Sequence, residues 1–561
     1  MGKSDFVIIG GVAAGTKTAA ALARRLPSAS ITVFQKEEHI SYGTCGLPYF
    51  ASGDINSFKD LTITQYGVVR SPEFFKNSKG VDVFINYEVI SIDKKAKTVA
   101  VNDLKTGETF EHGYGKLVLG TGANSAKSPF PVAESPRIKP FARPYDAINF
   151  RKMAQTGQIG TAVVVGGGFI GCEVAEAAGS LWGIEVTLVE KEKQLLPFVL
   201  DSEMAAIVSR ELARQDVNVI TGGMVEKIEL NGESNPVVKI QGQDEIVVDY
   251  VFLCLGVKPE VSLAKACGLE IGETGGILVD KHLRTSDEHI YAGGDCVESY
   301  HQITGRKTYM PMGSLANRHG WIIAENLAGN DIEFPGVVGA FLVKVFDLNV
   351  GAVGLTETAA ADAGIKAKSV WGSFPEKPDY YPEGKTITLK MVYGENDRKP
   401  LGLQAAGKGD ICRRVDVMSS FLQRRATIED LLKFEQGYAP PYSEALDPLH
   451  HLATMILAQG KGVSFISPGD DFENIDGDVI WLDVRETDEV KADSWPFANN
   501  CKLTNIPLND LVNHLDELDR DKRIILICKR GPRSYQASII LKQAGFENVE
   551  IVGGGVTASL K

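Results

Sequence analysis

Two cysteines of this 561-residue chain stand in glycine-bearing loops where a thiol is available for chemistry. Cys45 lies in the turn "SYGTCGLPYF" (residues 41–50), and Cys528 opens the loop "CKRGPR" after an apolar run. The eight cysteines are scattered and contain no CxxC pair. A solitary redox cysteine takes up a two-electron equivalent only by bonding to a thiol, a sulfane sulfur or an oxygen from outside the protein. The alternative for Cys45 is a small buried hydrophobic residue.

The loop after Cys528 has the composition of a sulfur cradle. Six residues, Cys528 to Arg533, lead into a helix-like stretch. Backbone N–H groups of such a loop and the positive helix end favour a thiolate or persulfide anion. Pro532 contributes no N–H, so the cradle has one donor fewer. The predicted loop site comprises Lys529, Arg530, Gly531 and Arg533, whose three basic side chains suit an anionic sulfur donor.

The stretch before Cys45 predicts a nucleotide-binding unit. "DFVIIGGVAAGTKTAAALARRL" has the pattern of a buried parallel strand, a glycine turn and a helix. Gly10 and Gly15 are the first and last glycines of a GxGxxG turn, and Val12 replaces the middle one. Such a turn brings N–H groups to a pyrophosphate. Gln35 stands where an acidic residue usually meets the ribose, and its amide can still bond a hydroxyl.

A second unit carries the complete fingerprint. "TAVVVGGGFIGCEVAEAAGSLWGIEVTLVE" contains Gly166, Gly168 and Gly171, and Glu190 ends the next strand 24 residues after Gly166. A carboxylate there accepts hydrogen bonds from the ribose 2′-hydroxyl and repels a 2′-phosphate, which favours NADH over NADPH. Lys191 and Lys193 follow at once and moderate that preference.

Two such units, with "KLVLGTGANS" (116–125) and "TSDEHIYAGGDCVE" (285–298), resemble the two-dinucleotide flavoprotein disulfide reductases. The resemblance implies an α/β chain with two Rossmann-like domains, for FAD and for NADH. It places the FAD domain at 1–150 and 255–330 and the NADH domain at 151–254. The implied FAD residues are Gly10, Gly15, Gln35, Gly122 and Asp295, the last near the ribityl–pyrophosphate.

The surroundings of Cys45 resemble one branch of that family. Ile40 and Phe50 stand where a CxxxxC pair would need its second cysteine. The stretch is similar to the "SFxxCGLPY" of coenzyme A-disulfide reductases, NADH oxidases and peroxidases, with Tyr42 replacing phenylalanine. A thiolate beside an oxidised flavin and a helix N-terminus is expected to have a lowered pKa and to be ready for attack.

"FLVKVFDLNVGAVGLTE" resembles the dimerisation domain of these reductases, expected at 335–455, and implies a homodimer. In the coenzyme A branch two tyrosines of this domain reach the partner's cysteine. The matching stretches "DYYPEGKTITLK" and "GYAPPYSEA" give Tyr380 and Tyr438, with Tyr381 as a rival to Tyr380.

The coenzyme A branch holds the nucleotide's phosphates with basic residues. The corresponding positions are Arg24 or Arg25, and Asn317 with Arg318 in "GSLANRHG". Exposed arginines on a helix are also common without a ligand.

After a linker at 456–471, residues 472–561 resemble a rhodanese domain, including its "LDVR" entry at 482–485. The alternative is a rhodanese-like binding domain without catalysis, although such domains usually lose the cysteine. The whole chain thus resembles NADH-dependent coenzyme A-disulfide/persulfide reductases with a C-terminal rhodanese domain. The substrate stays open among coenzyme A persulfide, polysulfide and coenzyme A disulfide, as does the direction of sulfur flow through Cys528. Rival functions are an NADH oxidase or peroxidase, or a flavin-based redox sensor.

The bulk composition limits the partners. The net charge of −13 argues against nucleic acid or an anionic membrane. The apolar runs are shorter than the roughly 20 residues of a membrane helix. Scattered free thiols fit a reducing cytoplasm, and no metal site is predicted.

Overall fold

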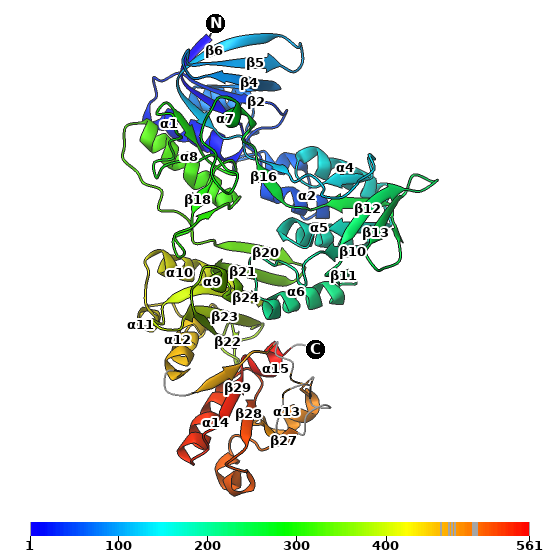
Figure 1. Cartoon of the computed structure of the whole chain (residues 1–561), viewed down its shortest axis with the longest axis vertical. Helices are drawn as coiled ribbons and strands as arrows, with labels where there is room; N and C mark the ends of the chain where they lie inside the picture. The colour runs from blue at the N-terminus through cyan, green and yellow to red at the C-terminus, as the bar shows by residue number, and fades with distance from the viewer. Residues whose placement is uncertain are drawn as a thin grey trace. The chain divides into compact units, whose positions relative to one another are not determined.

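In a computed structural model the chain is described for residues 2–459, 463–468, 472, 475, 478–495, 497 and 503–559 (Figure 1). It divides into two compact units. The first comprises Met1–Lys191 and Asp216–Val337, and the second comprises Glu192–Gln215 and Val338–Lys561.

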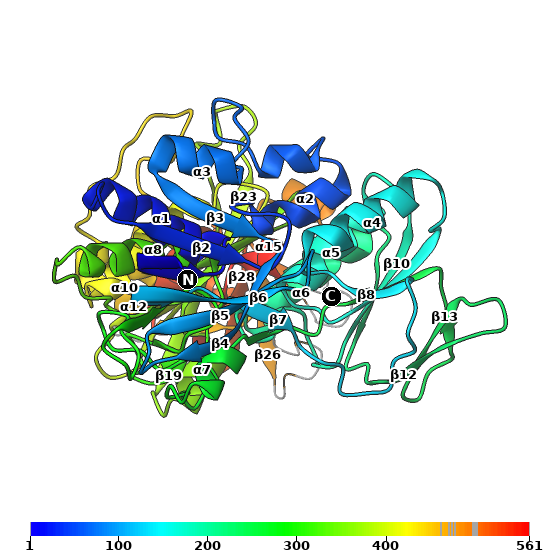
Figure 2. The same cartoon turned by 90° about the horizontal axis from the view of Figure 1, so that it is seen from above.

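The first unit opens with a sheet of order β3-β2-β1-β6-β5-β4, in which β17 also pairs with β6. The strands are β1 (Gly2–Ile9), β2 (Ile31–Gln35), β3 (Val81–Ile85), β4 (Tyr87–Asp93), β5 (Thr98–Asp103), β6 (Thr109–Leu119) and β17 (Ile290–Ala292). Val7 and Ile8 are wholly buried, as an apolar strand covered on both faces requires. The helices α1 (Ala13–Arg25) and α8 (Gly313–Leu327) pack side by side against it (Figure 2).

The second sheet of this unit is parallel, with order β11-β10-β9-β15-β8. Its strands are β8 (Ile138–Pro140), β9 (Thr161–Val165), β10 (Glu185–Glu190), β11 (Asn218–Thr221) and β15 (Tyr250–Leu253). The helix α5 (Phe169–Gly179) connects β9 to β10. Both predicted strand–turn–helix units are therefore confirmed.

Shorter elements complete the first unit. They are η1 (Thr44–Gly46), α2 (Leu47–Ser52), η2 (Phe58–Leu61), α3 (Pro72–Lys79), β7 (Ala123–Ser125), α4 (Pro144–Gln155), β12 (Val225–Leu230), β13 (Pro236–Ile240), β14 (Ile246–Val247), β16 (Val257–Pro259), α7 (Ser262–Ala266), β18 (Ser299–Tyr300) and β19 (Lys307–Thr308).

The second unit contains an antiparallel sheet of order β20-β21-β24-β23-β22. Its strands are β20 (Phe341–Val345), β21 (Leu348–Gly354), β22 (Ala367–Pro375), β23 (Thr386–Gly394) and β24 (Pro400–Gly407). Its helices are α6 (Ser202–Arg214), α9 (Glu357–Asp362), α10 (Cys412–Gln423), α11 (Ile428–Leu431) and α12 (Pro448–Gln459). The helix α6 comes from the middle of the predicted NADH domain, yet it packs on β24 of this sheet.

A parallel sheet of order β25-β29-β28-β26-β27 ends the chain. Its elements are β25 (Ser464–Ile466), β26 (Val479–Asp483), α13 (Thr487–Ala492), β27 (Leu503–Asn505), η4 (Leu511–Glu517), β28 (Arg523–Ile527), α14 (Pro532–Gln543), β29 (Val549–Val552) and α15 (Gly555–Ala558). The sequence placed 464–466 in a linker, which is wrong for these residues because they pair with β29. The predicted α/β fold class is confirmed.

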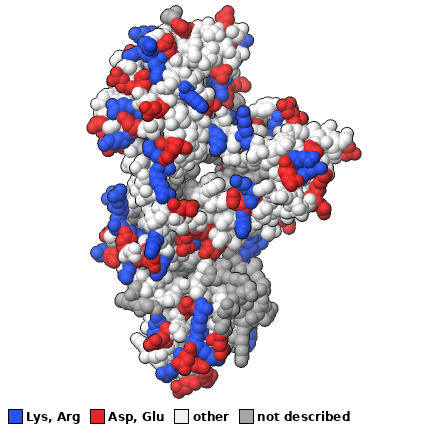
Figure 3. Space-filling model, in the orientation of Figure 1, with Lys and Arg blue, Asp and Glu red and all other residues white. Residues whose placement is uncertain are grey.

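The described surface mixes both signs of charge. In Figure 3, acidic and basic side chains are interspersed over the face shown, on a chain with a net charge of −13. None of the described helices has the length and apolar character needed to cross a bilayer.

Candidate active sites

In the first nucleotide turn, Gly10 and Gly15 have no room for a side chain. A Cβ on Gly10, whose φ is +105°, would lie 2.1 Å from the carbonyl oxygen of Gly120. A Cβ on Gly15 would lie 1.9 Å from the carbonyl oxygen of Gly10. The Gln35 amide oxygen accepts a hydrogen bond of 2.8 Å from the Gly11 N–H, so this side chain also braces the turn.

The second turn repeats this geometry. A Cβ on Gly166 (φ +110°) would lie 2.3 Å from the Cys254 carbonyl oxygen, and one on Gly171 would lie 1.8 Å from the Gly166 carbonyl oxygen. Gly168 faces open space within 4 Å. Buried Glu190 ends β10 and accepts a 2.6 Å hydrogen bond from the Gly167 N–H through Oε2. The structure thus gathers the four predicted NADH residues around one turn.

Cys45 lies in η1, directly before α2, and is exposed. Its Sγ is 3.4 Å from the position that a Cβ on Gly313, the first residue of α8, would occupy. Although the residue is exposed, protein atoms around its thiol exclude part of the water, and this desolvation raises the pKa of the Cys45 thiol. The charges of Glu173 and Asp295 raise it further. These groups of the protein act against the expected lowering, which depends on a bound flavin and therefore stays a prediction.

Glu173 of α5 is a site residue that the sequence analysis missed. Burial raises the pKa of its carboxyl to about 7. The Tyr49 hydroxyl donates a 3.4 Å hydrogen bond to Glu173 Oε1. A carboxyl group with such a pKa can exchange a proton near neutral pH. The only sequence signal was its place inside the second glycine fingerprint.

Asp295 tests whether the residues of the first unit fit a flavin dinucleotide. Burial raises the pKa of its carboxyl to about 6. Its Oδ1 is buried and has no hydrogen-bond partner among the described residues. Such an atom is costly unless a ligand hydroxyl satisfies it. A Cβ on Gly122, whose φ is +72°, would meet no atom within 4 Å, so the space next to Gly122 is open. Together with the Gly10–Gly15 turn, these residues fit FAD.

The predicted coenzyme A residues lie on the paired helices α1 and α8. Arg25 is bound to Glu325, with Nη2 2.7 Å from Oε1. Arg24 has no ion pair among the described residues, which favours it over Arg25 as a phosphate ligand. The Asn317 amide donates to the Gly313 carbonyl at 2.9 Å, and the Arg318 guanidinium lies 5.4 Å from the Phe334 ring centre.

The second unit brings two of the three candidate tyrosines together. The hydroxyl oxygens of Tyr380 and Tyr438 are 3.4 Å apart, and both side chains are exposed. Tyr381 instead faces Lys377, whose Nζ lies 5.7 Å from its ring centre.

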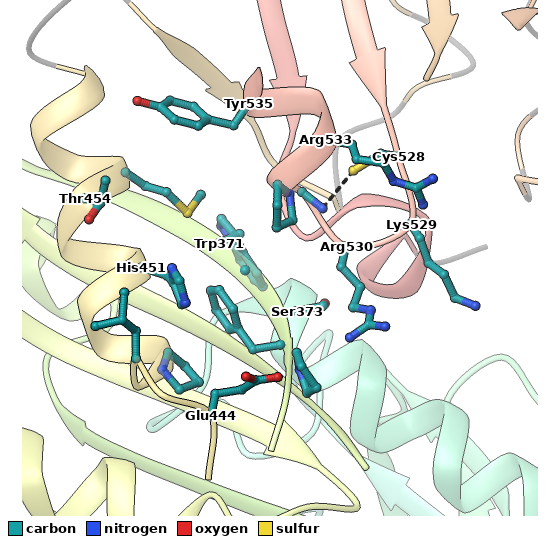
Figure 4. Close-up of a pocket in the computed structure, with 18 of the residues that line it drawn as sticks. Trp371, Ser373, Glu444, His451, Thr454, Cys528, Lys529, Arg530, Arg533 and Tyr535 are labelled. Atoms are coloured by element: carbon teal, nitrogen blue, oxygen red, sulfur yellow. Dashed lines mark hydrogen bonds between the residues drawn. The ribbon is translucent and has the colours of Figure 1, made fainter. Parts of the chain in front are cut away.

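Cys528 follows β28 and lies in the loop before α14. Its side chain is buried, and its Sγ accepts a 3.0 Å hydrogen bond from the Gly531 N–H (Figure 4). Gly531 has a φ of +121°, a left-handed region that glycine tolerates. The buried pair of Arg485 with Asp483, 2.6 Å between Nη2 and Oδ2, fixes the end of the neighbouring strand β26. The structure thus gives the Cys528 sulfur one backbone N–H donor, and the sulfur-binding role of the loop stays a prediction.

Both arginines of this loop are paired with carboxylates. Arg530 Nη2 lies 3.1 Å from Asp379 Oδ1, and Arg533 binds Glu489 at 2.5 and 2.8 Å. The hydrogen bond from Arg533 lowers the pKa of the Glu489 carboxyl to about 2. The predicted positive charge is thus locally balanced.

A cavity of about 790 Å³ lies in front of Cys528 (Figure 4). We call it the Cys528 cavity. Its other wall is built by β22, by α12 and by the loop before α12, and it includes Trp371, Phe374, Glu444 and His451. The His451 ring stacks on Phe374 with centres 5.7 Å apart. His451 was not among the candidate residues of the sequence, and only the tertiary structure places it in this wall.

The fold and the two thiol sites define a two-dinucleotide oxidoreductase with an attached sulfur-loop domain. The family model "Pyridine nucleotide-disulphide oxidoreductase" matches residues 4–312, and its dimerisation domain matches 341–450. The chain belongs to this family. A rhodanese-like domain matches residues 472–560. The predicted family and C-terminal domain are confirmed.

Named relatives share most of this architecture. The chain is 34% identical over 457 residues to "NAD(P)H sulfur oxidoreductase (CoA-dependent)" of Pyrococcus abyssi, covering 81% of this chain and 98% of the relative. The structure of a NAD-dependent persulfide reductase from A. fulgidus is 38% identical, with a TM-score of 0.93 and 99% of each chain covered. The structure of reduced CoADR-RHD from Bacillus anthracis is 31% identical, with a TM-score of 0.91, covering 100% of this chain and 98% of that one.

Proposed function

We propose that this protein uses NADH to reduce the sulfur–sulfur bond of coenzyme A persulfide, polysulfide or coenzyme A disulfide at Cys45, while Cys528 handles sulfane sulfur. The observation that carries the proposal is the presence of two separate thiol sites. Cys45 is within reach of the charges of Glu173 and Asp295, and the Cys528 sulfur accepts a hydrogen bond from the Gly531 N–H. The names of the relatives, which include sulfur, persulfide and coenzyme A, support the substrate class.

The cofactor assignment rests on the two turns. Gly10, Gly15, Gln35, Gly122 and Asp295 would hold FAD, and Gly166, Gly168, Gly171 and Glu190 would hold NADH. When bound, the flavin supplies two-electron chemistry between the nicotinamide and sulfur. Asp295 would accept a hydrogen bond from a ligand hydroxyl through the oxygen that has no protein partner.

The chemistry at Cys45 follows from sulfur exchange. The thiolate attacks the coenzyme A sulfur, a bond forms to Sγ, and the other sulfur leaves with the electron pair as hydrosulfide or coenzyme A thiolate. Reduction of this mixed disulfide by the two electrons of NADH, with one proton from its hydride and a second from the medium, then restores Cys45 and frees coenzyme A. Glu173 holds or releases a proton here, in line with its pKa of about 7.

The quaternary and ligand assignments belong to the same proposal. In a homodimer, Tyr380 and Tyr438 would reach the Cys45 site of the partner subunit, and Arg24, Asn317 and Arg318 would bind the phosphates of coenzyme A. The matched dimerisation domain supports this arrangement. The seven cysteines that the structure describes are all free, which supports a cytoplasmic protein.

The test replaces Cys45 by serine and measures NADH oxidation with coenzyme A persulfide and, separately, with coenzyme A disulfide. Loss of both activities with flavin retained is expected. Unchanged turnover rejects the role of Cys45, and oxygen-dependent turnover that exceeds both sulfur activities rejects the substrate class. Mass spectrometry of the purified protein for flavin and coenzyme A tests the ligands.

A further inference from the structure

The Cys528 cavity combines a sulfur nucleophile with balanced charge. Three basic side chains line it, Lys529, Arg530 and Arg533, and so do three carboxylates, Asp379, Glu444 and Glu489. The two arginines are tied to Asp379 and Glu489 by the ion pairs described above. A loop of three basic residues therefore presents little net charge to an incoming donor.

The remaining wall of the cavity is apolar. Trp371, Phe374, Leu446, Met455 and Phe465 line it together with His451. Its volume of about 790 Å³ lies within the range of cavities that enclose an organic ligand. A small inorganic anion would fill little of this space and would contact none of the apolar wall favourably.

The glycines at 553–555 bring β22 and the Cys528 loop into close contact. A Cβ on Gly553 would lie 2.7 Å from Trp371 Cβ, and one on Gly555 would lie 2.2 Å from the Cys528 carbonyl oxygen. The Val556 N–H also donates a 2.9 Å hydrogen bond to that carbonyl. The main chain at 553–555 is therefore close-packed between β22 and the cysteine loop.

We propose that the Cys528 cavity takes sulfane sulfur from a persulfide carried on an uncharged organic arm, and that Asp379 and Glu489 act against thiosulfate by occupying the loop arginines. Both residues are specificity determinants. This inference rests on the proposed function in assigning sulfur transfer to Cys528, and it adds the class of donor.

The transfer of the sulfane sulfur to Cys528 needs no added reductant. The Cys528 thiolate attacks the outer sulfur of R–S–SH, and a sulfur–sulfur bond forms at Sγ. The bond between the two donor sulfurs breaks, and its electron pair leaves on R–S⁻. Cys528 becomes a persulfide that keeps the donor's proton, and the sulfane sulfur keeps its oxidation state.

The experiment loads Cys528 in the full-length Cys45→Ser protein without NADH. One donor is N-acetylcysteamine persulfide, whose organic arm is uncharged, and the other is thiosulfate, an inorganic dianion. Peptide mass spectrometry reads the gain of one sulfur at Cys528. The variants are Asp379→Asn and Glu489→Gln. The matched control is Asp478→Asn, an exposed carboxylate that pairs with Lys522 at 2.5 Å in the same domain and does not line the cavity.

We expect the parent protein to load faster from N-acetylcysteamine persulfide than from thiosulfate. Because Asp379 is exposed, its loss should speed loading from thiosulfate about threefold to tenfold. The same change should alter loading from N-acetylcysteamine persulfide less than about twofold. Added salt should slow only the thiosulfate reaction of the variant. The control should match the parent.

Faster loading from thiosulfate in the parent would overturn the inference, as would an unchanged donor ratio in both variants. The readout needs no NADH, so it is independent of the reductase reaction. Failure of NADH oxidation with persulfide would refute the proposed function at Cys45 and would leave the donor preference of Cys528 readable.

Discussion

The hydroxyl groups of Tyr380 and Tyr438 lie 3.4 Å apart on exposed segments that are 58 residues distant in sequence. The hydrogen bond between the two hydroxyls raises the pKa of the Tyr380 phenol, which is protonated at neutral pH. A protonated phenol pair can donate to a thiolate or to a leaving sulfur.

Replacing either tyrosine of this pair by phenylalanine should therefore lower kcat for NADH-dependent sulfur reduction by about tenfold or more, with a smaller change in KM. Tyr381→Phe is the matched control, because it removes the same atom from the adjacent residue. Steady-state kinetics with coenzyme A persulfide measures the effect. Equal activity of all three variants would show that the pair has no part in the reaction.

Removal of the Glu173 charge should make Cys45 more acidic. The charge of Glu173 raises the pKa of the Cys45 thiol, so Glu173→Gln should lower that pKa. The rate of Cys45 alkylation by iodoacetamide against pH, read by peptide mass spectrometry, measures this. Exposed Cys412 in the same sample is the internal reference. Identical profiles in parent and variant would contradict the electrostatic contact.

The same carboxyl gives the fold a pH dependence. The folded pKa of Glu173, about 7, is above its ordinary value of 4.5, so the folded state binds more protons between these values. The stability that the protonated Glu173 contributes is fully present below pH 4.5, and it is lost as the pH rises towards 7. In thermal unfolding, the Tm of Glu173→Gln should rise relative to the Tm of the parent as the pH increases from 4.5 to 7. A constant difference in Tm across that window would contradict the shift.

The nucleotide preference should depend on Glu190. Its carboxylate is held at the end of β10 by the Gly167 N–H. Glu190→Gln keeps the shape and removes the repulsion of a 2′-phosphate, so the ratio of kcat/KM for NADPH over NADH should rise about tenfold. Glu185→Gln, at the exposed start of the same strand, is the control. A ratio that stays unchanged would remove Glu190 from nucleotide selection.

Lys390 should be essential for the stability of the second unit. Its side chain is fully buried and lies 2.8 Å from Asp201, 3.4 Å from Glu203 and 2.5 Å from Glu357. Burial lowers the pKa of Lys390, but these carboxylates outweigh that effect and raise it overall.

Lys390→Met leaves three carboxylates without their cation, and it should cost about 3–5 kcal/mol of unfolding free energy. Urea unfolding measures the loss. Lys368→Met is the control, since its exposed pair with Glu395 at 3.1 Å should be worth at most about 1 kcal/mol. Similar losses in the two variants would contradict the buried cluster.

The sequence predicted best what is encoded in adjacent residues. The glycines of both turns, Glu190 and the Cys528 loop each lie within one strand–turn–helix segment, where spacing fixes geometry. The partners of those residues were not predictable in this way. Asp379 meets Arg530 across 151 positions of sequence, and only the packed tertiary structure brings them together.

Two further differences have physical reasons. The strand Ser464–Ile466 has three residues, too few to show a period, and it gains its hydrogen bonds from β29. The lowered pKa expected for Cys45 assumed a positive environment, whereas the chain adds burial and two carboxyl groups.

The glycines at 553–555 leave no room for even a methyl group between Trp371 and the backbone of Cys528. Another sulfurtransferase domain joined at this position would need glycines at the same places to pack as closely against β22. The C-terminal domain at 472–560 is therefore fitted to this particular partner domain and cannot be exchanged freely for another sulfurtransferase domain.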